Sequence, residues 1–127
     1  MKVNIDTKEK FTVITPLLAN FNDNVTGELV ETITNCLLKE CKNVILNLSN
    51  ISELEPALTD SLVKLREQFY NNNASFVTCC PNKEVLRKIK ELELEEALNL
   101  TLTESEAWDI VQMDEIEREF EEGEADL

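Results

Sequence analysis

The stretch from residue 43 to residue 70, NVILNLSNISELEPALTDSLVKLREQFY, constrains the fold more than any other part of the chain. Its β-branched and aliphatic run, Val44 to Leu48, predicts a strand that is buried on both faces. Pro56 has a fixed φ and no amide proton, so it suits the first turn of a helix with Glu55 at the cap. Apolar residues then recur at the spacing of one helical face that packs on a sheet. They are Leu58, Leu62, Leu65 and Phe69.

The turn between this strand and this helix is the candidate functional surface. A strand that leads directly into a helix start directs several backbone N–H groups and the positive end of the helix dipole at one surface point. That point lies near Glu55, Pro56 and Ala57. We therefore expect the chain to bind its partner there.

Two strands and a helix are predicted before this unit. Apolar residues alternate with polar ones in the ranges 3–5 and 11–13, which predicts two antiparallel strands joined near residues 7–10. Pro16 cannot donate to a strand ladder, so we expect it on a sheet edge or at a bulge. The polar residues 22–24 suit the cap of a first helix. Its apolar positions are Leu29, Val30, Ile33, Leu37 and Leu38.

A strand, a helix, a short strand and a last helix are predicted after it. The run 74–80, ASFVTCC, predicts a strand parallel to the one before it. Pro81 and Asn82 open a third helix, and alternation over 98–102 predicts a short final strand. Thr103 and Glu106 form a capping box that starts the last helix. Its expected apolar face consists of Ala107, Ile110, Val111, Met113 and Phe120.

The chain is predicted to be one α/β domain with the order β-β-α-β-α-β-α-β-α. Its 127 residues are 43% hydrophobic, which is enough to bury a core. We place the domain at residues 1–120 and an acidic C-terminal tail at residues 121–127. No long apolar run or secretory pattern occurs, so a cytoplasmic protein without membrane insertion is expected.

Acidic charge excludes several classes of partner. The formal net charge is −14, and residues 114–127 carry eight acids and a single arginine. Such a field repels phosphate backbones and anionic lipid, so we expect no binding to nucleic acid or membranes. A solvated, partly frayed tail is the favoured interpretation of the acidic run, and a basic protein partner is the alternative.

The residues for most enzyme chemistry are missing. The chain has no histidine, and its two glycines do not form a phosphate-binding loop. The four cysteines are expected to be buried free thiols, although Cys79 and Cys80 leave a vicinal redox pair open. Glu53 and Glu55 are the one acidic pair to inspect at the turn, and with Asp60 they form the one carboxylate set to consider for a metal. We expect no enzyme activity, no cofactor and no metal.

The order of elements, together with VILNLSNISELEPALTDSLVKL, ASFVTCCPNKEVLRKI and LELEEAL, resembles the STAS domain of anti-sigma factor antagonists. The resemblance spans about Val3 to Glu119 and implies a mixed sheet of four to five strands with helices. It also implies a turn of the form Asp-Ser-Ser-Gly or Asp-Ser-Thr-Gly, in which a kinase-type anti-sigma factor phosphorylates the second hydroxyl residue. In this chain the acidic position falls on Glu55, the next on Pro56, the acceptor position on Ala57 and the glycine on Leu58.

These departures from the family pattern change the expected mechanism. Ala57 has no hydroxyl, so a switch that adds a phosphate charge cannot operate there. Glu55 instead leaves a fixed negative charge at the helix start, which partly resembles the phosphorylated, release-prone state. Two further family glycines fall on Ala19 and Glu93. The nearby hydroxyls at Ser52, Thr59 and Ser61 are expected to be capping or surface groups rather than acceptors.

Two functions follow from the resemblance. The first is a non-enzymatic regulatory module that binds a protein, such as a kinase-type anti-sigma factor, through the turn and the following helix. The second is a soluble subunit of an ABC-type lipid transport system that binds its ATPase. The sequence leaves the oligomeric state open. The residues expected to contact the partner are Ser52, Glu53, Glu55, Pro56, Ala57, Thr59 and Asp60.

Overall fold

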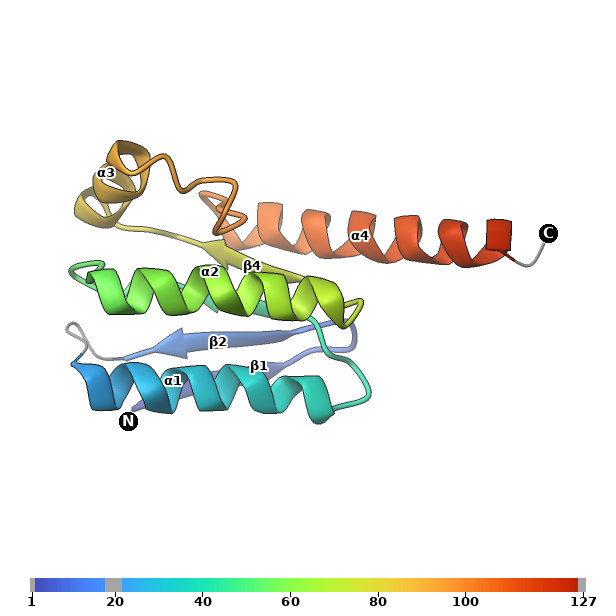
Figure 1. Cartoon of the computed structure of the whole chain (residues 1–127), viewed down its shortest axis with the longest axis horizontal. Coiled ribbons are helices and arrows are strands. Elements are labelled where there is room, and N and C mark those ends of the chain that lie inside the picture. The colour runs from blue at the N-terminus through green and yellow to red at the C-terminus, as the bar shows by residue number, and fades with distance from the viewer. Residues whose placement is uncertain (1, 18–21, 126–127) are drawn as a thin grey trace.

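The computed structural model describes residues 2–17 and 22–125, which form a four-stranded sheet and its helices (Figure 1). The sheet has the order β1-β2-β3-β4, in which β1 is antiparallel to β2 while β2, β3 and β4 are parallel. The mixed α/β class predicted from the sequence is therefore confirmed. The elements are β1 (Val3–Thr7), β2 (Thr12–Pro16), α1 (Asp23–Asn35), η1 (Cys36–Leu38), β3 (Val44–Asn47), α2 (Pro56–Asn71), β4 (Phe76–Cys79), α3 (Lys83–Glu91) and α4 (Glu104–Ala125).

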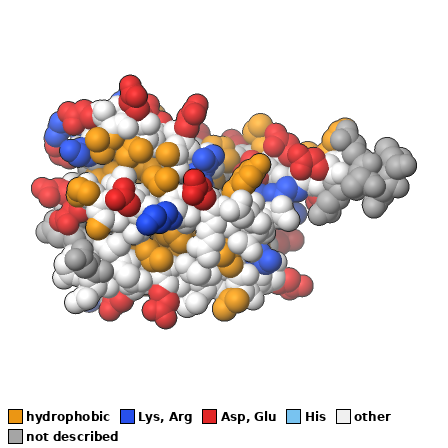
Figure 2. All heavy atoms as spheres, viewed as in Figure 1, with side chains coloured by type: hydrophobic (Ala, Val, Ile, Leu, Met, Phe, Trp, Pro, Cys, Tyr) orange, Lys and Arg blue, Asp and Glu red, His pale blue; other side chains and the backbone are white. Residues whose placement is uncertain are grey.

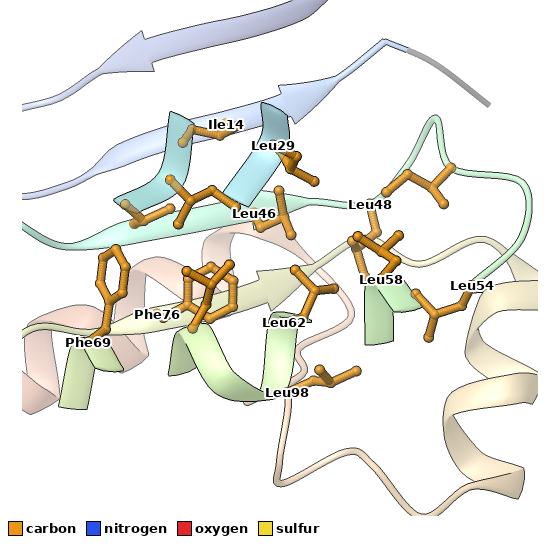
Figure 3. Packing of buried hydrophobic residues seen from close by; sticks show 14 of the residues in the cluster. Ile14, Leu29, Leu46, Leu48, Leu54, Leu58, Leu62, Phe69, Phe76 and Leu98 are labelled. Carbon is orange, nitrogen blue, oxygen red and sulfur yellow. The ribbon is translucent and has the colours of Figure 1, made fainter. Parts of the chain in front are cut away.

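The sheet is covered on both faces, because side chains alternate across each strand. Val44 and Leu46 of β3 join a core cluster with residues of α1, α2 and α3. Ile45, between them, joins a second cluster with Ala107 and Val111 of α4. Figure 3 shows the first cluster, in which the predicted stripe of α2 lies over β3 and β4. The buried two-faced strand and the inward face of α2 are both confirmed.

Aromatic and aliphatic packing fixes α2 along its whole length. Leu58 and Leu62 are completely buried near its start, and Phe69 is completely buried near its end. The Phe69 ring lies 5.6 Å from the ring of Phe76 on β4, centroid to centroid. The start of α2 is therefore held at one position relative to the carboxyl end of β3.

Both of the central helices end in the same hydrogen-bonded turn. At the end of α2, Asn73 has a φ of 56°, and the amide of Ala74 donates to the carbonyl of Phe69 at 2.9 Å. At the end of α3, Glu93 has a φ of 53°, and the amide of Leu94 donates to the carbonyl of Ile89 at 3.0 Å. These are Schellman motifs, which favour glycine at the left-handed position. Glu93 is one of the positions at which the STAS resemblance implies glycine; another of them, Ala19, lies outside the described residues.

The predicted final strand is wrong. Leu100 makes one isolated bridge with Thr78, and the hydrophobic alternation around it does not continue as a strand. Residues 95–98 instead form a helical turn that closes with Asn99 at a φ of 51°, and the amide of Leu100 donates to the carbonyl of Glu95 at 2.9 Å. A left-handed residue cannot continue an extended strand, so the segment pairs at a single point.

Three other expectations are corrected. Pro16 is the last residue of β2, which is an interior strand, and it lies beyond the residues of β2 that pair with β3. Its missing amide proton is tolerated because no neighbour needs it there. Leu38 is 86% exposed, since the chain tightens into η1 after α1. On α4, Met113 and Phe120 are 60% and 68% exposed instead of buried.

The helix caps agree with the sequence. Asn22 accepts a hydrogen bond from the amide of Val25 at 2.9 Å at the start of α1. Thr103 accepts one from the amide of Glu106 at 3.1 Å at the start of α4. The last helix then continues through residue 120 to Ala125. The division of the chain into a domain at residues 1–120 and a tail at residues 121–127 stays a prediction. None of the helices in the described ranges is both long and apolar enough to cross a membrane.

Candidate functional site

The loop between β3 and α2 is anchored by short-range hydrogen bonds and by buried side chains. Asn47, the last residue of β3, accepts a hydrogen bond from the amide of Ser49 at 2.9 Å. The amide of Ile51 donates to the carbonyl of Leu48 at 3.0 Å and closes a turn. Leu48, Ile51 and Leu54 are buried in the core. The loop therefore presents the residues between these anchors in a fixed arrangement.

The structure brings the predicted site residues together at the surface, with one exception. Thr59 is only 6% exposed, and its hydroxyl donates to the carbonyl of Glu55 at 3.0 Å. Ser61 is half-buried, and its hydroxyl donates to the carbonyl of Ala57 at 2.9 Å. Both hydroxyls thus bond to the turn before them on α2. The exposed members of the set are Ser52, Glu53, Glu55, Pro56, Ala57 and Asp60.

The start of α2 has no side-chain cap. Glu55 stands at the N-cap position with extended backbone, but its carboxylate makes no capping hydrogen bond. Pro56 occupies the first helical turn as predicted, and no acidic residue lies within that turn. The positive end of the helix dipole therefore faces the exposed surface around Ala57, with the Glu55 charge beside it.

A groove lies next to this helix start, between α2 and α3. It has a volume of about 590 Å³. Figure 2 shows hydrophobic side chains gathered between these two helices, with charged side chains around them. Apolar grooves with few charged groups are typical of binding surfaces. The groove is lined by Leu54, Pro56, Thr59, Asp60, Val63, Lys64, Lys88, Leu92 and Leu94.

Sequence reasoning missed this groove. Leu92, at the C-cap of α3, is 48% exposed, although its spacing from Val85 and Ile89 is that of an inward-facing residue. Leu94 follows the Schellman turn and is half-buried. One signal in the sequence was available, because the STAS resemblance implies glycine at the position of Glu93 and such a glycine marks a turn. At that turn the chain reverses and places Leu94 beside α2.

Asn82 connects the loop to α3. Its Oδ1 accepts a hydrogen bond from the amide of Val85 at 2.9 Å, which caps α3. Its Nδ2 donates to the carbonyl of Ile51 at 2.6 Å. One side chain thus fixes both the start of α3 and the loop before α2. The two walls of the groove are held relative to each other by this contact.

The thiols and carboxylates are less suited to chemistry. All four cysteines are free, with Cys36 and Cys79 buried and Cys41 and Cys80 half-buried, so the expected burial of all four is wrong for the last two. Burial, followed by the neighbouring Cys80 thiol, raises the pKa of Cys79. Cys80 follows the end of β4 and has a φ of 59°, so the alternation of side chains along a strand does not by itself separate its thiol from that of Cys79. Within residues 2–17 and 22–125 no three histidine, cysteine, aspartate or glutamate side chains are grouped to hold a metal ion.

The comparisons with known proteins agree on the fold. Among solved structures, the chain is similar to a putative anti-sigma factor antagonist from Thermotoga maritima, with a TM-score of 0.77, 17% identity, and coverage of 87% of this chain and 94% of that one. An anti-sigma factor antagonist from Mycobacterium paratuberculosis has a TM-score of 0.75 and 14% identity, and the match covers 87% of this chain and 93% of that one. The phosphorylated form of the Bacillus cell fate determinant SpoIIAA has a TM-score of 0.64 and 14% identity, and the match covers 87% of this chain and 99% of that one.

Sequence comparison gives the family. No curated protein matches the sequence. The family model of the STAS domain matches residues 3–107, which is most of the chain and includes every element from β1 to the start of α4. The chain therefore belongs to the STAS domain family.

Proposed function

We propose that this protein is a non-enzymatic regulatory module that binds a protein partner through the start of α2 and the adjacent groove. The observation that carries the proposal is that Ala57 is exposed at an uncapped helix start beside the groove. An exposed, fixed turn next to an apolar depression is suited to receive a side chain of another protein. The solved structures of similar fold include anti-sigma factor antagonists, which supports a partner of the anti-sigma factor class.

The charges at this surface indicate what the partner should offer. Glu53, Glu55 and Asp60 are exposed around the helix start. Lys64 and Lys88 lie among the residues that line the groove. A partner that fits both parts carries an apolar side chain for the groove and a basic group for the acidic turn.

We further propose that phosphorylation at the helix start does not regulate this binding. Ala57 carries a methyl group where the family resemblance implies a hydroxyl. Thr59 and Ser61 already donate their hydroxyl protons to backbone carbonyls of the preceding turn. Glu55 places a carboxylate two residues before Ala57, so the helix start carries an acidic group without any covalent modification.

Mass spectrometry after incubation with candidate kinase-type anti-sigma factors and ATP tests the second part. We expect the mass of the wild-type protein to stay unchanged. The matched variant Ala57→Ser restores a hydroxyl at an exposed position and should gain one phosphate from a kinase that recognises the site. Phosphate on residues 52–61 of the wild-type chain would contradict the proposal.

Binding measurements with a groove variant test the first part. Leu92→Ser removes a half-exposed apolar side chain from the groove, and Leu38→Ser removes a more exposed one from η1. We expect Leu92→Ser to weaken binding of the anti-sigma factor about fivefold or more. Leu38→Ser should leave the affinity unchanged. Equal effects of the two variants would refute a docking role for the groove.

The lipid-transport alternative stays a prediction. Purification of the tagged protein from its own cells distinguishes the two functions, because an ABC ATPase and a kinase-type anti-sigma factor differ in sequence and are identified by mass spectrometry.

A further inference from the structure

The last helix, α4, has one face in contact with the sheet. Ala107 and Val111 are completely buried there. One turn further on, Asp114 accepts a hydrogen bond from the hydroxyl of Ser75 at 2.7 Å. Arg118 donates to the same hydroxyl, so the inward face continues to that residue. These contacts define the side of α4 that faces the domain.

The opposite side of α4 carries an exposed apolar stripe. Met113, Ile116 and Phe120 are 60%, 63% and 68% exposed. They follow one another at steps of three and four residues, so they lie on one helical face over two turns, about 10 Å. That face is roughly 140 to 200° around the helix from Val111. We call these three residues the outer stripe.

The charged residues of α4 that flank the outer stripe are acidic. Asp109, Glu117 and Glu119 are exposed on the same helix. The single base between residues 104 and 125 is Arg118, and its guanidinium points inward to Ser75 and lies 4.0 Å from Asp114. No lysine or arginine of α4 therefore offsets the acids beside the stripe. Figure 2 shows hydrophobic and acidic side chains next to each other along α4.

We propose that the outer stripe binds a basic amphipathic helix of a second protein. An apolar stripe of this length fits a helix that presents apolar residues at steps of three and four, and the flanking acids fit lysine or arginine on both sides of it. The stripe of a second copy of this chain is a poor occupant, because the same acids would face one another. An anionic membrane is repelled for the same reason.

This surface is separate from the proposed anti-sigma factor site. Figure 1 shows the start of α2 and all of α3 at one end of the molecule and the free end of α4 at the other. The inference thus does not rest on the proposed function. A partner helix on the outer stripe leaves the groove accessible.

A set of synthetic helical peptides tests the proposal. The probe has leucine at positions i, i+3 and i+7 and lysine on its flanks, and the control peptide has the same composition in scrambled order. Fluorescence anisotropy of a dye on each peptide gives the affinity for the full chain. We expect the probe to bind at least about tenfold more tightly than the scrambled peptide, a difference of about 1.4 kcal/mol. Binding should weaken as salt rises from about 0.05 M to about 0.5 M.

Two double variants assign the binding to the stripe. Ile116→Ser with Phe120→Ser should abolish the tenfold preference. Leu17→Ser with Leu38→Ser removes two exposed apolar side chains elsewhere and should preserve it. The absence of a preference in the wild-type chain, or its survival in the stripe variant, would overturn the proposal.

Two further results would overturn it in favour of another occupant. One is a dimer of the protein alone, seen by sedimentation and lost in the stripe variant. The other is co-sedimentation with phosphatidylserine-containing vesicles that the stripe variant loses. We expect the wild type and the stripe variant both to sediment as monomers in the first experiment. In the second, we expect neither protein to sediment with the vesicles.

Discussion

Replacing Asn82 by alanine removes two hydrogen bonds with one substitution. The variant leaves α3 without its N-cap, which costs about 1 kcal/mol. It also leaves the carbonyl of the buried residue Ile51 without the amide that donates to it at 2.6 Å. An unpaired buried acceptor costs about 1–2 kcal/mol more. We therefore expect Asn82→Ala to lower the free energy of unfolding by about 2–3 kcal/mol.

Asn22 provides a matched control, because it caps α1 with a hydrogen bond of the same length. The amides of Val25 and Val85 donate to Asn22 and Asn82, respectively, at 2.9 Å in both cases. Asn22→Ala should therefore cost only about 1 kcal/mol. Serine also caps helices but is too short to reach Ile51, so Asn82→Ser should lose about 1–2 kcal/mol while Asn22→Ser is near neutral.

Urea denaturation followed by circular dichroism measures these differences, provided that the slopes of the transitions agree. The reasoning is refuted if Asn82→Ala and Asn22→Ala destabilise the protein equally. In that case the contact between Asn82 and the loop would contribute nothing, and another feature would have to hold the two walls of the groove together.

Two other predictions concern the core. Phe69→Ala should cost about 3–5 kcal/mol because the side chain is completely buried, whereas Tyr70→Ala, at a position that is 78% exposed, should stay within about 0.5 kcal/mol; similar midpoints in urea would contradict the packing described for α2. The raised pKa of Cys79 means that the folded protein keeps this proton at a pH where the unfolded chain loses it. Stability from this thiol is fully present below about pH 8.5 and is lost as pH rises further. Unfolding measurements over that range should show a shallower loss for Cys79→Ala than for the wild type, and identical slopes would exclude the effect.

The central unit could be predicted because its signals are local. Pro56 fixes the start of α2 by its own geometry, and the apolar face of that helix repeats over about three turns within one short stretch. Neither signal requires knowledge of a distant part of the chain. The exposure of Glu55 and Ala57 followed from the same signals, since a turn between two buried elements must reach the surface.

The errors occurred where tertiary structure overrides a local pattern. Leu98 and Leu100 alternate with polar residues as in a strand, but the left-handed backbone at Asn99 ends the extension after one bridge. Met113 and Phe120 have helical spacing, yet α4 has two apolar faces, and spacing alone does not say which one meets the sheet. The hydrogen bonds of Asp114 and Arg118 to Ser75 show which face of α4 is turned toward the domain, and the sequence did not indicate these bonds.

The groove, and the hydrogen bond between Asn82 and Ile51 that holds its walls together, could not be predicted for a different reason. Asn82 and Ile51 are 31 residues apart in the chain, and their contact exists only because the carboxyl ends of β3 and β4 lie side by side. Val63 and Leu94 likewise line the same groove only because α2 and the chain after α3 pack side by side. Such contacts depend on the complete topology rather than on any window of sequence.

The left-handed residue at the end of α3 makes this protein less stable to heat than its fold allows. Glu93 has a φ of 53°, a backbone conformation that costs about 1 kcal/mol for a residue with a Cβ, and its side chain is exposed rather than packed in the core. The Schellman hydrogen bonds maintain the turn despite that cost. A relative of this protein with glycine at position 93 would therefore unfold at a higher temperature, while its groove-lining side chains and its outer stripe would stay the same.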